Sequence, residues 1–462
     1  MRDGVRELRD AIDAPKEASL NTQFAENTNR MSLYKIVDIF LLKNPTLKLP
    51  SHDSVLELAE RFSQFFTNKI SEIRHQLDSQ SDHLSPRSEI RPTGEAVLLA
   101  LIDLSTAFDT FNHAILLDRM FSRFGISGSA LQWFRSYLTG HTQFVGVNGS
   151  FSSSVSLHFG VSQVFVCGPI LFIIYNSPFH NIPTTRGISD HGYANDEQFY
   201  ISFRPSTDGV PQNSAFSSMS CISEFKLWAA DNKLKFNDCK TDALLITSSF
   251  LKKKPTPSAL AVGDHLIKIS EAVHNLGLFM DTYLTMDPHI KQSCKKAFYH
   301  LSRIAPINKH LKPAALKLLV HSFVMSQLDY GNSLLAGFTN DRMERLQRVQ
   351  NCAARLITGT RRCDSITPHL KSFHWLPIKL RIDFKIALLC YLSLNSCASL
   401  YLYNLLQRPN SSVSLRSSSA QKLAVPSSRT KTNGDRAFSV YAAKFWNHLP
   451  STICSSPSSR IV

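Results

Sequence analysis

The run AVLLALID, residues 96–103, constrains the fold of this chain more than any other stretch. Seven consecutive apolar residues lead to an aspartate without a polar break. Such a run is typical of a strand that is buried on both faces of a sheet. A carboxylate at the end of that strand is costly to bury unless it has a partner or a cation. The sequence therefore predicts a central strand that ends at a charged residue, Asp103.

Helix and strand patterns alternate after this strand. Two segments with helical spacing, 113–125 and 129–140, are followed by strand-like residues around an Asn-Gly turn. The segment GPILFIIYNSPF then predicts a buried helix with Pro169 in its first turn. The stretch GYANDEQFY, residues 192–200, reads as two short strands joined by a turn, and residues 234–249 read as another pair of strands. Because strands and helices are interspersed, the expected fold class is α+β.

Segments of different composition surround this α+β core. Helical periodicity precedes it, and helical patterns return after Pro288. Six regions result: a polar segment at 1–30, a helical region at 31–76, a polar linker at 77–95, the α+β core at 96–285, an α-helical region at 286–405, and a Ser-rich basic tail at 406–462.

The charge balance points to a polyanionic partner. Lysine and arginine total 51 against 36 acidic residues, which gives a net charge of +15. An excess of this size favours nucleic acid before membrane, although a protein that is merely basic would show the same balance. The nine cysteines form no CxxC pair, which indicates reduced thiols in an intracellular protein, nuclear or cytoplasmic, without a zinc site. Neither a signal peptide nor a membrane span is expected.

Two acidic residues are candidates for a metal site. Asp103 ends the buried strand, and Asp196 lies at the tip of the expected hairpin. Two carboxylates from neighbouring strands suit Mg²⁺, which takes its remaining ligands from water and substrate phosphates. The alternative for Asp103 is a helix cap, because a helical pattern follows it.

Four stretches occur in a fixed order along the core. They are LIDLSTAFDTFNHAILLDRM, GVSQVFVCGPILFIIYNSPF, YANDEQFYISF and FKLWAADNKLKFNDCKTDALLI. In this order they resemble the first to fourth palm motifs of the reverse transcriptase region of non-LTR (LINE-type) retrotransposons, in particular the L2/CR1/jockey group. VHNLGLFMD resembles the strand before the thumb of that family. The resemblance covers nearly the whole chain after about residue 29.

The resemblance implies both a fold and an activity. The fold would be a reverse-transcriptase palm, a ferredoxin-like sheet with helices, followed by an α-helical thumb. The activity would be that of an RNA-directed DNA polymerase, which transfers nucleotides by a two-metal mechanism with Mg²⁺. Its partners would be an RNA template and a DNA primer.

The family pattern also gives roles to matching positions. The two aspartates would bind metal at the catalytic centre. Phe108 would be the aromatic gate that disfavours ribonucleotides, Gln163 would approach the incoming nucleotide, and Lys240 would protonate the departing pyrophosphate. The alternatives are a core residue for Phe108, a capping group for Gln163 and a solvated turn residue for Lys240.

The match departs from the family pattern at three points. Asn195 stands where the YADD motif has its first aspartate, usually the essential metal ligand, so the site loses a negative charge while the turn is kept. Val164 stands where the family has glycine, and a β-branched residue would crowd the substrate. The fingers are expected to be largely missing, as is the amino-terminal endonuclease of many relatives. We therefore expect a truncated copy with a degraded active site.

Three functions are compatible with this pattern. The first is an RNA-directed DNA polymerase that is impaired at Asn195. The second is a non-catalytic nucleic-acid-binding protein, in which Arg342, Arg345 and Arg348 form a stripe along a helix and contact phosphates. A solvated arginine-rich face is the alternative for that helix. The third is a non-functional remnant of the element.

Overall fold

A computed structural model describes most of the chain from residue 95 onward. The described residues are 95–105, 107–110, 112–143, 146–147, 150–151, 155–156, 159–161, 167–248, 251, 254–408, 422–428 and 433–454. The polar segment at 1–30, the helical region at 31–76 and all but the last residue of the linker lie outside these ranges.

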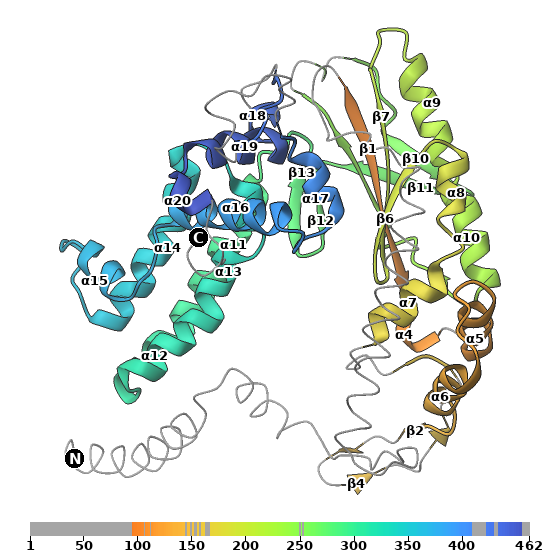
Figure 1. The fold of residues 1–462 in the computed structure, drawn as a ribbon, viewed down its shortest axis with the longest axis horizontal. Coiled ribbons are helices and arrows are strands. Elements are labelled where there is room, and N and C mark those ends of the chain that lie inside the picture. The colour runs from red at the N-terminus through yellow and green to blue at the C-terminus, as the bar shows by residue number, and fades with distance from the viewer. Residues whose placement is uncertain are drawn as a thin grey trace, which may run out of the picture. The chain divides into compact units, whose positions relative to one another are not determined.

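The chain divides into two compact units, which we name the sheet unit and the helical unit (Figure 1). The sheet unit comprises residues 88–289 and 427–437. The helical unit comprises residues 1–87, 290–426 and 438–462. The division near residue 289 falls within the first turn of helix α11 (Asp287–Ile304), close to residue 285, where the sequence predicts the core to end.

The sheet unit is built around β1 (Ala96–Ser105), the apolar run that dominates the sequence. The strand order is β10-β11-β9-β1-β7-β6, with β8 also paired to β1, and neighbours are antiparallel except for β11 and β9. The other strands are β6 (Ser189–Tyr193), β7 (Asp196–Phe203), β8 (Lys235–Phe236), β9 (Asp242–Ile246), β10 (Ala259–Val262) and β11 (His265–Ser270). Strands β1, β6, β7 and β9, with helices after β1 and after β7, have the β-α-β-β-α-β order of the ferredoxin-like fold. This topology confirms the expected α+β palm.

Helices connect the strands and cover one face of the sheet. Between β1 and β6 lie α4 (Ala107–Thr110), α5 (His113–Ser122), α6 (Gly128–Leu138), α7 (Gly168–Asn176) and α8 (Asn181–Thr185), and after β7 lie α9 (Val210–Met219) and α10 (Ile222–Asp231). The helices predicted from the sequence in this region are therefore confirmed. Asn112 caps α5 by accepting a hydrogen bond from Ala114 N at 2.8 Å, and Pro169 lies in the first turn of α7. Helices α8, α9 and α10 lie along the same side of the sheet (Figure 1).

Four strands of two residues each follow α6. Strand β2 (Thr142–Gln143) pairs with β5 (Val155–Ser156), and β3 (Gly146–Val147) pairs with β4 (Ser150–Phe151). The inner pair flanks the Asn-Gly dipeptide at which the sequence predicts a turn between strands.

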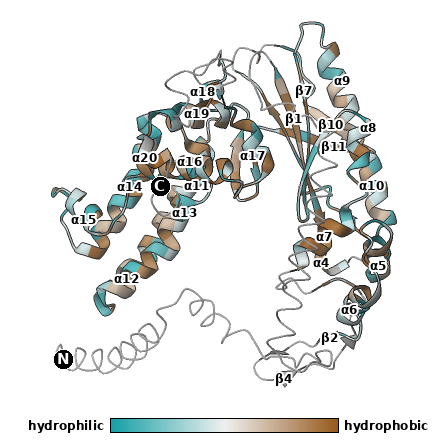
Figure 2. Ribbon diagram, in the orientation of Figure 1, coloured by the Kyte–Doolittle hydropathy of each residue, from teal (hydrophilic) through white to brown (hydrophobic). Residues whose placement is uncertain are grey.

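The face of the sheet under the helices, which we call the covered face, holds an aromatic core. Phe199 of β7 is fully buried there with Phe179 and Phe225. The ring centroids lie 5.2 Å apart for Phe179 and Phe225 and 5.7 Å apart for Phe199 and Phe225. Burying one such side chain stabilises the fold by roughly 1.5–3 kcal/mol. Figure 2 shows that β1 and α7, which belong to the same unit, are also rich in apolar residues.

The opposite face of the sheet, which we call the second face, carries a smaller aliphatic core. Its buried members are Val97, Leu99, Leu244, Ile246 and Val273. Val273 belongs to a hairpin formed by β12 (Ala272–Asn275) and β13 (Leu278–Asp281). The side chain of Asn275 contacts β7, where Gln198 Nε2 donates to Asn275 Oδ1 at 3.1 Å. Gln198 is the next residue after Asp196 on this face of β7, so the hairpin lies close to Asp196.

The helical unit confirms the helical patterns predicted after Pro288. Its elements after α11 are η2 (Ala305–His310), α12 (Pro313–Val320), η3 (His321–Met325), α13 (Ser326–Asp329), η4 (Asn332–Leu335), α14 (Asn340–Thr358), α15 (Thr367–Ser372), α16 (Ile378–Leu394), α17 (Leu400–Leu405), α19 (Phe438–His448) and α20 (Ser451–Cys454). The short helix α18 (Asn433–Arg436) belongs to the sheet unit. Among the described residues, no helix is long and apolar enough to cross a membrane.

Two helices of this unit, α19 and α20, lie in the predicted Ser-rich tail. Helix α19 packs against α16, where the Tyr441 hydroxyl donates to Asp383 Oδ1 at 2.9 Å. Trp446 of α19 is buried. Sequence analysis assigned no helix here, because Ser-rich segments flank the short apolar pattern on both sides.

Candidate active site

The register of the central strands brings two aspartates together. Strands β1 and β7 are antiparallel, and Asp103 lies directly opposite Asp196 in their ladder. Directly opposed residues of an antiparallel pair have their side chains on the same face, with Cβ atoms about 4.5–5.5 Å apart. Both aspartates lie on the second face, beyond the end of its aliphatic core. The structure therefore places the two predicted metal ligands side by side.

A tight turn joins β6 to β7 next to this pair. Tyr193 pairs with Asp196, so the turn contains only Ala194 and Asn195. Ala194 has φ = 57°, in the left-handed region that favours glycine. A non-glycine residue in this region carries backbone strain that the surrounding hairpin must hold. The turn predicted from GYANDEQFY forms, with Asn195 half-buried immediately before Asp196 in the chain.

The electrostatics of the pair show a need for positive charge. Burial raises the pKa of Asp196, and the nearby carboxylate of Asp103 raises it further. His274, from the hairpin on the second face, acts in the opposite direction. A carboxylate whose ionisation is disfavoured by burial and by a neighbouring carboxylate forms a site that a cation would stabilise.

The residues present fit a divalent cation only in part. Asp103 and Asp196 supply the hard oxygen ligands that Mg²⁺ prefers. In the described part of the chain, no group of three or more His, Cys, Asp or Glu side chains could hold a metal ion. The turn residue at the family's first YADD aspartate position is Asn195, whose amide oxygen carries no charge. The site thus has the position of a metal centre with one charged ligand fewer than the family pattern.

A turn between β8 and β9 lies against Asp103. Asn237 Nδ2 donates to Asp103 Oδ2 at 2.9 Å, and Asn237 N donates to Asp103 O at 3.0 Å. Lys240 follows in the same turn, where its main-chain N donates to Asn237 O at 3.2 Å and its side chain is exposed. The structure thus brings Lys240 to the loop beside Asp103. Sequence analysis missed Asn237, although its position three residues before Lys240 could have marked it as a turn residue next to the site.

A second acidic residue of β7 points the other way. Glu197 follows Asp196, is 2% exposed and lies on the covered face. Asn176 Nδ2 donates to Glu197 Oε1 at 3.0 Å. Burial raises the pKa of Glu197 to about 8, against the opposing effect of the hydrogen bond from Asn176. Sequence analysis did not select Glu197, although strand alternation after Asp196 places it on the opposite face.

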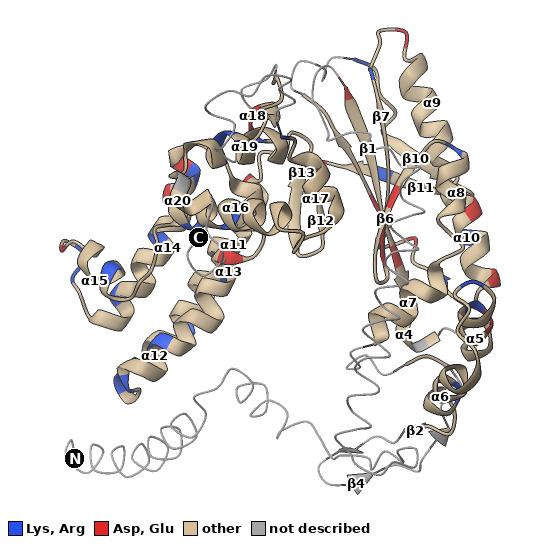
Figure 3. Ribbon diagram, in the orientation of Figure 1, with Lys and Arg blue, Asp and Glu red and all other residues tan. Residues whose placement is uncertain are grey.

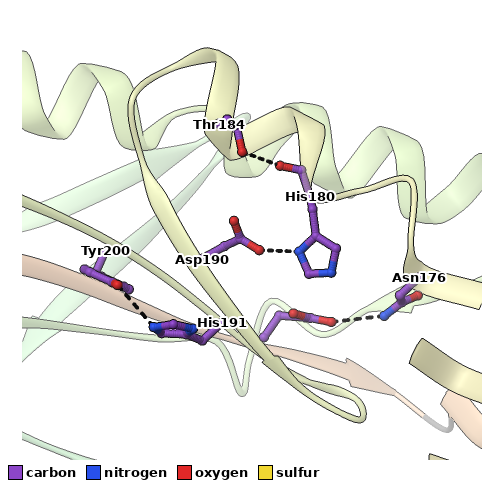
Figure 4. A network of polar contacts seen from close by, with 7 residues as sticks. Asn176, His180, Thr184, Asp190, His191 and Tyr200 are labelled. Atoms are coloured by element: carbon purple, nitrogen blue, oxygen red, sulfur yellow. Dashed lines mark hydrogen bonds and ion pairs between the residues drawn. The ribbon is translucent and has the colours of Figure 1, made fainter. Parts of the chain in front are cut away.

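Polar contacts on both faces of the sheet also involve the β6–β7 hairpin. His180 Nδ1 contacts the carboxylate of Asp190 in β6, and Thr184 Oγ1 donates to His180 O at 2.7 Å (Figure 4). The Tyr200 hydroxyl lies 3.1 Å from His191 Nε2. The Asn176–Glu197 bond ties the hairpin to α7, and the His180–Asp190 contact ties it to the residue before α8, so both stabilise the position of the turn.

Of the three residues predicted to contact the substrate, the structure describes only Phe108. Phe108 of α4 is half-buried, and its ring centroid lies 5.2 Å from that of Phe172 in α7. Val161 N donates to Phe108 O at 2.7 Å, which holds the start of the second motif beside Phe108. Gln163 and Val164 lie outside the described residues. The roles predicted for Phe108, Gln163 and Val164 stay predictions.

The predicted arginine stripe lies on α14 of the helical unit. Arg342 stacks over the Phe338 ring at 5.0 Å, and Arg345 NH2 lies 3.5 Å from Asp341 Oδ2. Arg348 is exposed. The apolar stripe of the same helix is buried, as its spacing predicts: Met343, Leu346 and Val349. Figure 3 shows Lys and Arg along α12, α14 and α15.

Comparisons with known proteins agree with the geometry of the site. Residues 52–280 match the family model described as "Reverse transcriptase (RNA-dependent DNA polymerase)". The chain is 24% identical over 244 residues to the "Probable RNA-directed DNA polymerase from transposon X-element" of Drosophila melanogaster, a match that covers 49% of this chain and 24% of that protein. It is 24% identical over 266 residues to the corresponding protein from transposon BS of the same fly, covering 56% of this chain and 28% of that protein. The chain thus spans about a quarter of the length of these relatives.

Solved structures give weaker likenesses. A telomerase of Candida tropicalis with a fragment of telomeric RNA is 10% identical, with a TM-score of 0.32 over 70% of this chain and 59% of that chain. The apo telomerase of the same yeast is 11% identical, with a TM-score of 0.32 over 76% of this chain and 57% of that chain. The match of motif order, now joined by the family model and the two transposon proteins, confirms the resemblance to LINE-type elements. From residue 52 to residue 280, the chain is a reverse transcriptase domain of the kind that transposon RNA-directed DNA polymerases carry.

Proposed function

We propose that the sheet unit is the palm of an RNA-directed DNA polymerase whose catalytic centre is intact in geometry and weakened in charge. The register that sets Asp103 directly opposite Asp196 carries this proposal. It places two carboxylates at the tip of the β6–β7 hairpin, where the family pattern has its metal ligands. The hairpin itself keeps its two-residue turn with Asn195 in place of aspartate.

The proposed chemistry is the extension of a DNA primer along an RNA template. Reverse transcriptases generally use divalent metal ions, and Mg²⁺ bound here would supply positive charge for the attacking and leaving oxygens. Asp103 and Asp196 would hold it through their carboxylate oxygens. Lys240, exposed on the turn beside Asp103, would give a proton to the departing pyrophosphate. Phe108 would lie against the sugar of the incoming nucleotide.

Asn195 is the reason to expect impaired activity. Mg²⁺ gives up its water ligands reluctantly and relies on charged oxygen ligands to do so. An amide oxygen at position 195 offers a dipole where the family offers a full negative charge. The loss of this charge weakens metal binding while the fold of the hairpin is kept.

Primer extension on an RNA template tests this proposal. We would compare the unaltered chain, Asn195→Asp, and Asn195→Asp with Asp103→Ala, each with Mg²⁺ and deoxynucleotides. We expect extension by Asn195→Asp, much slower extension by the unaltered chain, and none by the double variant. Equal extension by Asn195→Asp with and without Asp103 would contradict the proposed centre.

A second candidate function, nucleic-acid binding without catalysis, is favoured by the charge of the helical unit. Residues 288–340 contain seven lysines and arginines but one acidic residue, Asp329, which leaves a net charge of +6. Within this stretch, Lys291, Lys295 and Tyr299 are exposed at spacings of four residues along α11. Residues four apart share one face of a helix. That face therefore combines positive charge with an aromatic ring, a combination that binds nucleic-acid strands.

The salt dependence of binding tests this candidate. The logarithm of affinity for a labelled RNA oligonucleotide should fall with the logarithm of salt concentration, and each lysine that neutralises a phosphate contributes about one to the slope. Replacing Lys291 and Lys295 together by alanine should lower the slope by about two. Replacing Lys268, an exposed lysine of β11, serves as the matched control and should leave the slope unchanged. Equal slopes for all three proteins would exclude α11 as the binding surface.

A further inference from the structure

The ladder along the second edge of β1 is interrupted at Asp103. Strand β9 pairs with Val97–Leu101 of β1, and β8 pairs with Leu104 and Ser105. Residues 237–241 leave the ladder between these two strands. The break opens beside Asp103, which keeps β7 as its partner on the other edge. Sequence analysis predicted a pair of strands at 234–249, and both strands form, but each pairs with β1 rather than with the other.

Asn237 fills the break with two hydrogen bonds to the same residue. Its main-chain N donates to the Asp103 carbonyl at 3.0 Å, which continues the ladder by one bond. Its side-chain Nδ2 donates to Asp103 Oδ2 at 2.9 Å. Both residues are half-buried, so the side-chain bond is partly shielded from competing water. One carboxylate oxygen of Asp103 is thereby engaged, and Oδ1 remains for another ligand.

The main chain of Asn237 is held independently of its side chain. Its carbonyl accepts hydrogen bonds from Lys240 N at 3.2 Å, Thr241 N at 3.1 Å and Thr241 Oγ1 at 2.8 Å. The next residue, Asp238, accepts from Lys226 Nζ of α10 at 2.7 and 2.8 Å. Asparagine in a turn commonly uses its side chain to bond its own backbone. Here other groups already close the turn, and the amide of Asn237 is directed at Asp103 instead.

We propose that Asn237 is a positioning residue for the metal ligand Asp103, which fixes the carboxylate so that one oxygen is engaged and the other is presented to a divalent cation. This inference rests on the proposed function of the site. Groups that hydrogen-bond to a metal ligand orient it, and losing one typically lowers metal affinity about 10–100-fold. In this chain the effect carries more weight, because Asn195 leaves Asp103 and Asp196 as the charged ligands of the site.

The same residue connects the metal ligand to the proposed general acid. Lys240 is anchored through its main-chain N to the carbonyl of Asn237, whose side chain holds Asp103. A displacement of Asn237 would therefore move both groups together. Removing only the side chain of Asn237 would release Asp103 and leave the turn that carries Lys240 in place.

Mn²⁺ binding, followed by the electron paramagnetic resonance signal of the free ion, tests the inference without any turnover. We would titrate the full chain and its Asn195→Asp variant, each alone and with Asn237→Ala, Asp238→Asn or Asp103→Ala. Asp238→Asn is the matched control, since it loses the ion pair with Lys226 in the same turn but keeps the contact between Asn237 and Asp103. Thermal melting of every variant would identify any loss of fold.

We expect Asn237→Ala to weaken Mn²⁺ binding about tenfold, Asp238→Asn to change it less than twofold, and Asp103→Ala to abolish it. Unchanged binding in Asn237→Ala, with binding lost in Asp103→Ala, would overturn the role of Asn237 and leave the proposed metal site standing. An equal loss in Asp238→Asn and Asn237→Ala would also overturn it, because the turn rather than the amide would then matter. Unchanged binding in Asp103→Ala would overturn the metal site and the inference together.

Discussion

Asp196 and Glu197 are neighbours in the sequence and belong to different environments in the structure. Asp196 lies on the second face of the sheet, opposite Asp103 and half-exposed to solvent. Glu197 lies on the covered face, 2% exposed and hydrogen-bonded to Asn176 of α7. Burial raises the pKa of both carboxyls, and for Glu197 the pKa reaches about 8.

The difference shows that neighbouring residues of one strand can take different roles, one at a candidate metal site and the other in the interior of the unit. Successive residues of a strand point to opposite faces, so a single step along β7 moves from a site that a cation would stabilise to the interior. An acid on the second face can serve as a ligand because solvent reaches it. An acid on the covered face stays protonated at neutral pH and holds the hairpin to the helices. Asn195 alters only the first of these environments.

Removing aromatic support from the covered face should have the largest effect on stability. Phe199→Ala deletes a fully buried ring between Phe179 and Phe225, and we expect a loss of about 3–5 kcal/mol in the free energy of unfolding. Gln198→Ala, one step away on the second face, is the matched control and should lose about 1 kcal/mol or less. Denaturant unfolding followed by tryptophan fluorescence measures both. Similar losses at the two positions would contradict the division between the faces.

Removing the ligand on the second face should change chemistry and not stability. In the Asn195→Asp background, Asp196→Asn should lower primer extension on the order of 100-fold or more. Its melting temperature should stay the same or rise slightly, since a neutral amide replaces the carboxyl of Asp196, whose ionisation burial and Asp103 disfavour. A variant that melts much earlier than its parent would show that Asp196 supports the fold, contrary to its assignment here.

The buried acid should reveal itself in the pH dependence of stability. Native Glu197 keeps its proton up to about pH 8, whereas the unfolded chain releases it near pH 4.5. Between these values the native state binds more protons, so the stability contributed by Glu197 falls as pH rises, by about 1.4 kcal/mol per pH unit. It is fully present below about pH 4.5 and lost once the pH passes about 8.

Glu197→Gln should abolish this trend, because the amide does not ionise. Stability curves of the two proteins, measured from pH 5 to pH 9, should diverge up to about pH 8 and run parallel above it. The difference between them removes the contributions of Asp190 and His180, which both proteins share. Parallel curves throughout would place Glu197 in a more polar environment than its burial indicates.

The smallest predicted effect concerns the strand opposite Glu197. Gly192 pairs with Glu197, and a Cβ at this position would lie 2.6 Å from Glu197 Oε2. Gly192→Ala should therefore destabilise the hairpin on the order of 1 kcal/mol, through displacement of the buried carboxyl. Shortening the acid with Glu197→Asp should reduce the effect of Gly192→Ala in a double-mutant cycle. Additive effects of the two substitutions on stability would show that the two positions do not interact.

The sequence predicts the second face better than the covered face. The apolar run before Asp103 and the turn after Tyr193 identify β1 and the β6–β7 hairpin, because strand burial and turn chemistry are local properties. The neighbourhood of Asp103 and Asp196 follows from the family motifs, and the ladder register agrees with it. Glu197 was missed because a single acid in a polar strand gives no signal of burial until the face is known.

Non-local pairing explains the other omissions. The break between β8 and β9 arises because both strands pair with β1. No local sequence pattern predicts this pairing. Asn237 therefore looked like an ordinary turn residue. Helix α19 was missed for a similar reason, since its buried face is completed by α16 about fifty residues earlier. In each case the deciding contact joins segments far apart in the sequence.

The most direct test of the central claim is the position of a bound metal. Crystals of the unaltered chain and of Asn195→Asp, soaked in Mn²⁺, would locate the ion by its anomalous scattering. We predict a strong peak between the carboxylates of Asp103 and Asp196 in Asn195→Asp and a weaker one at the same place in the unaltered chain. Peaks of equal strength in the two proteins, or a metal in Asn195→Asp that avoids Asp103 and Asp196, would contradict the account.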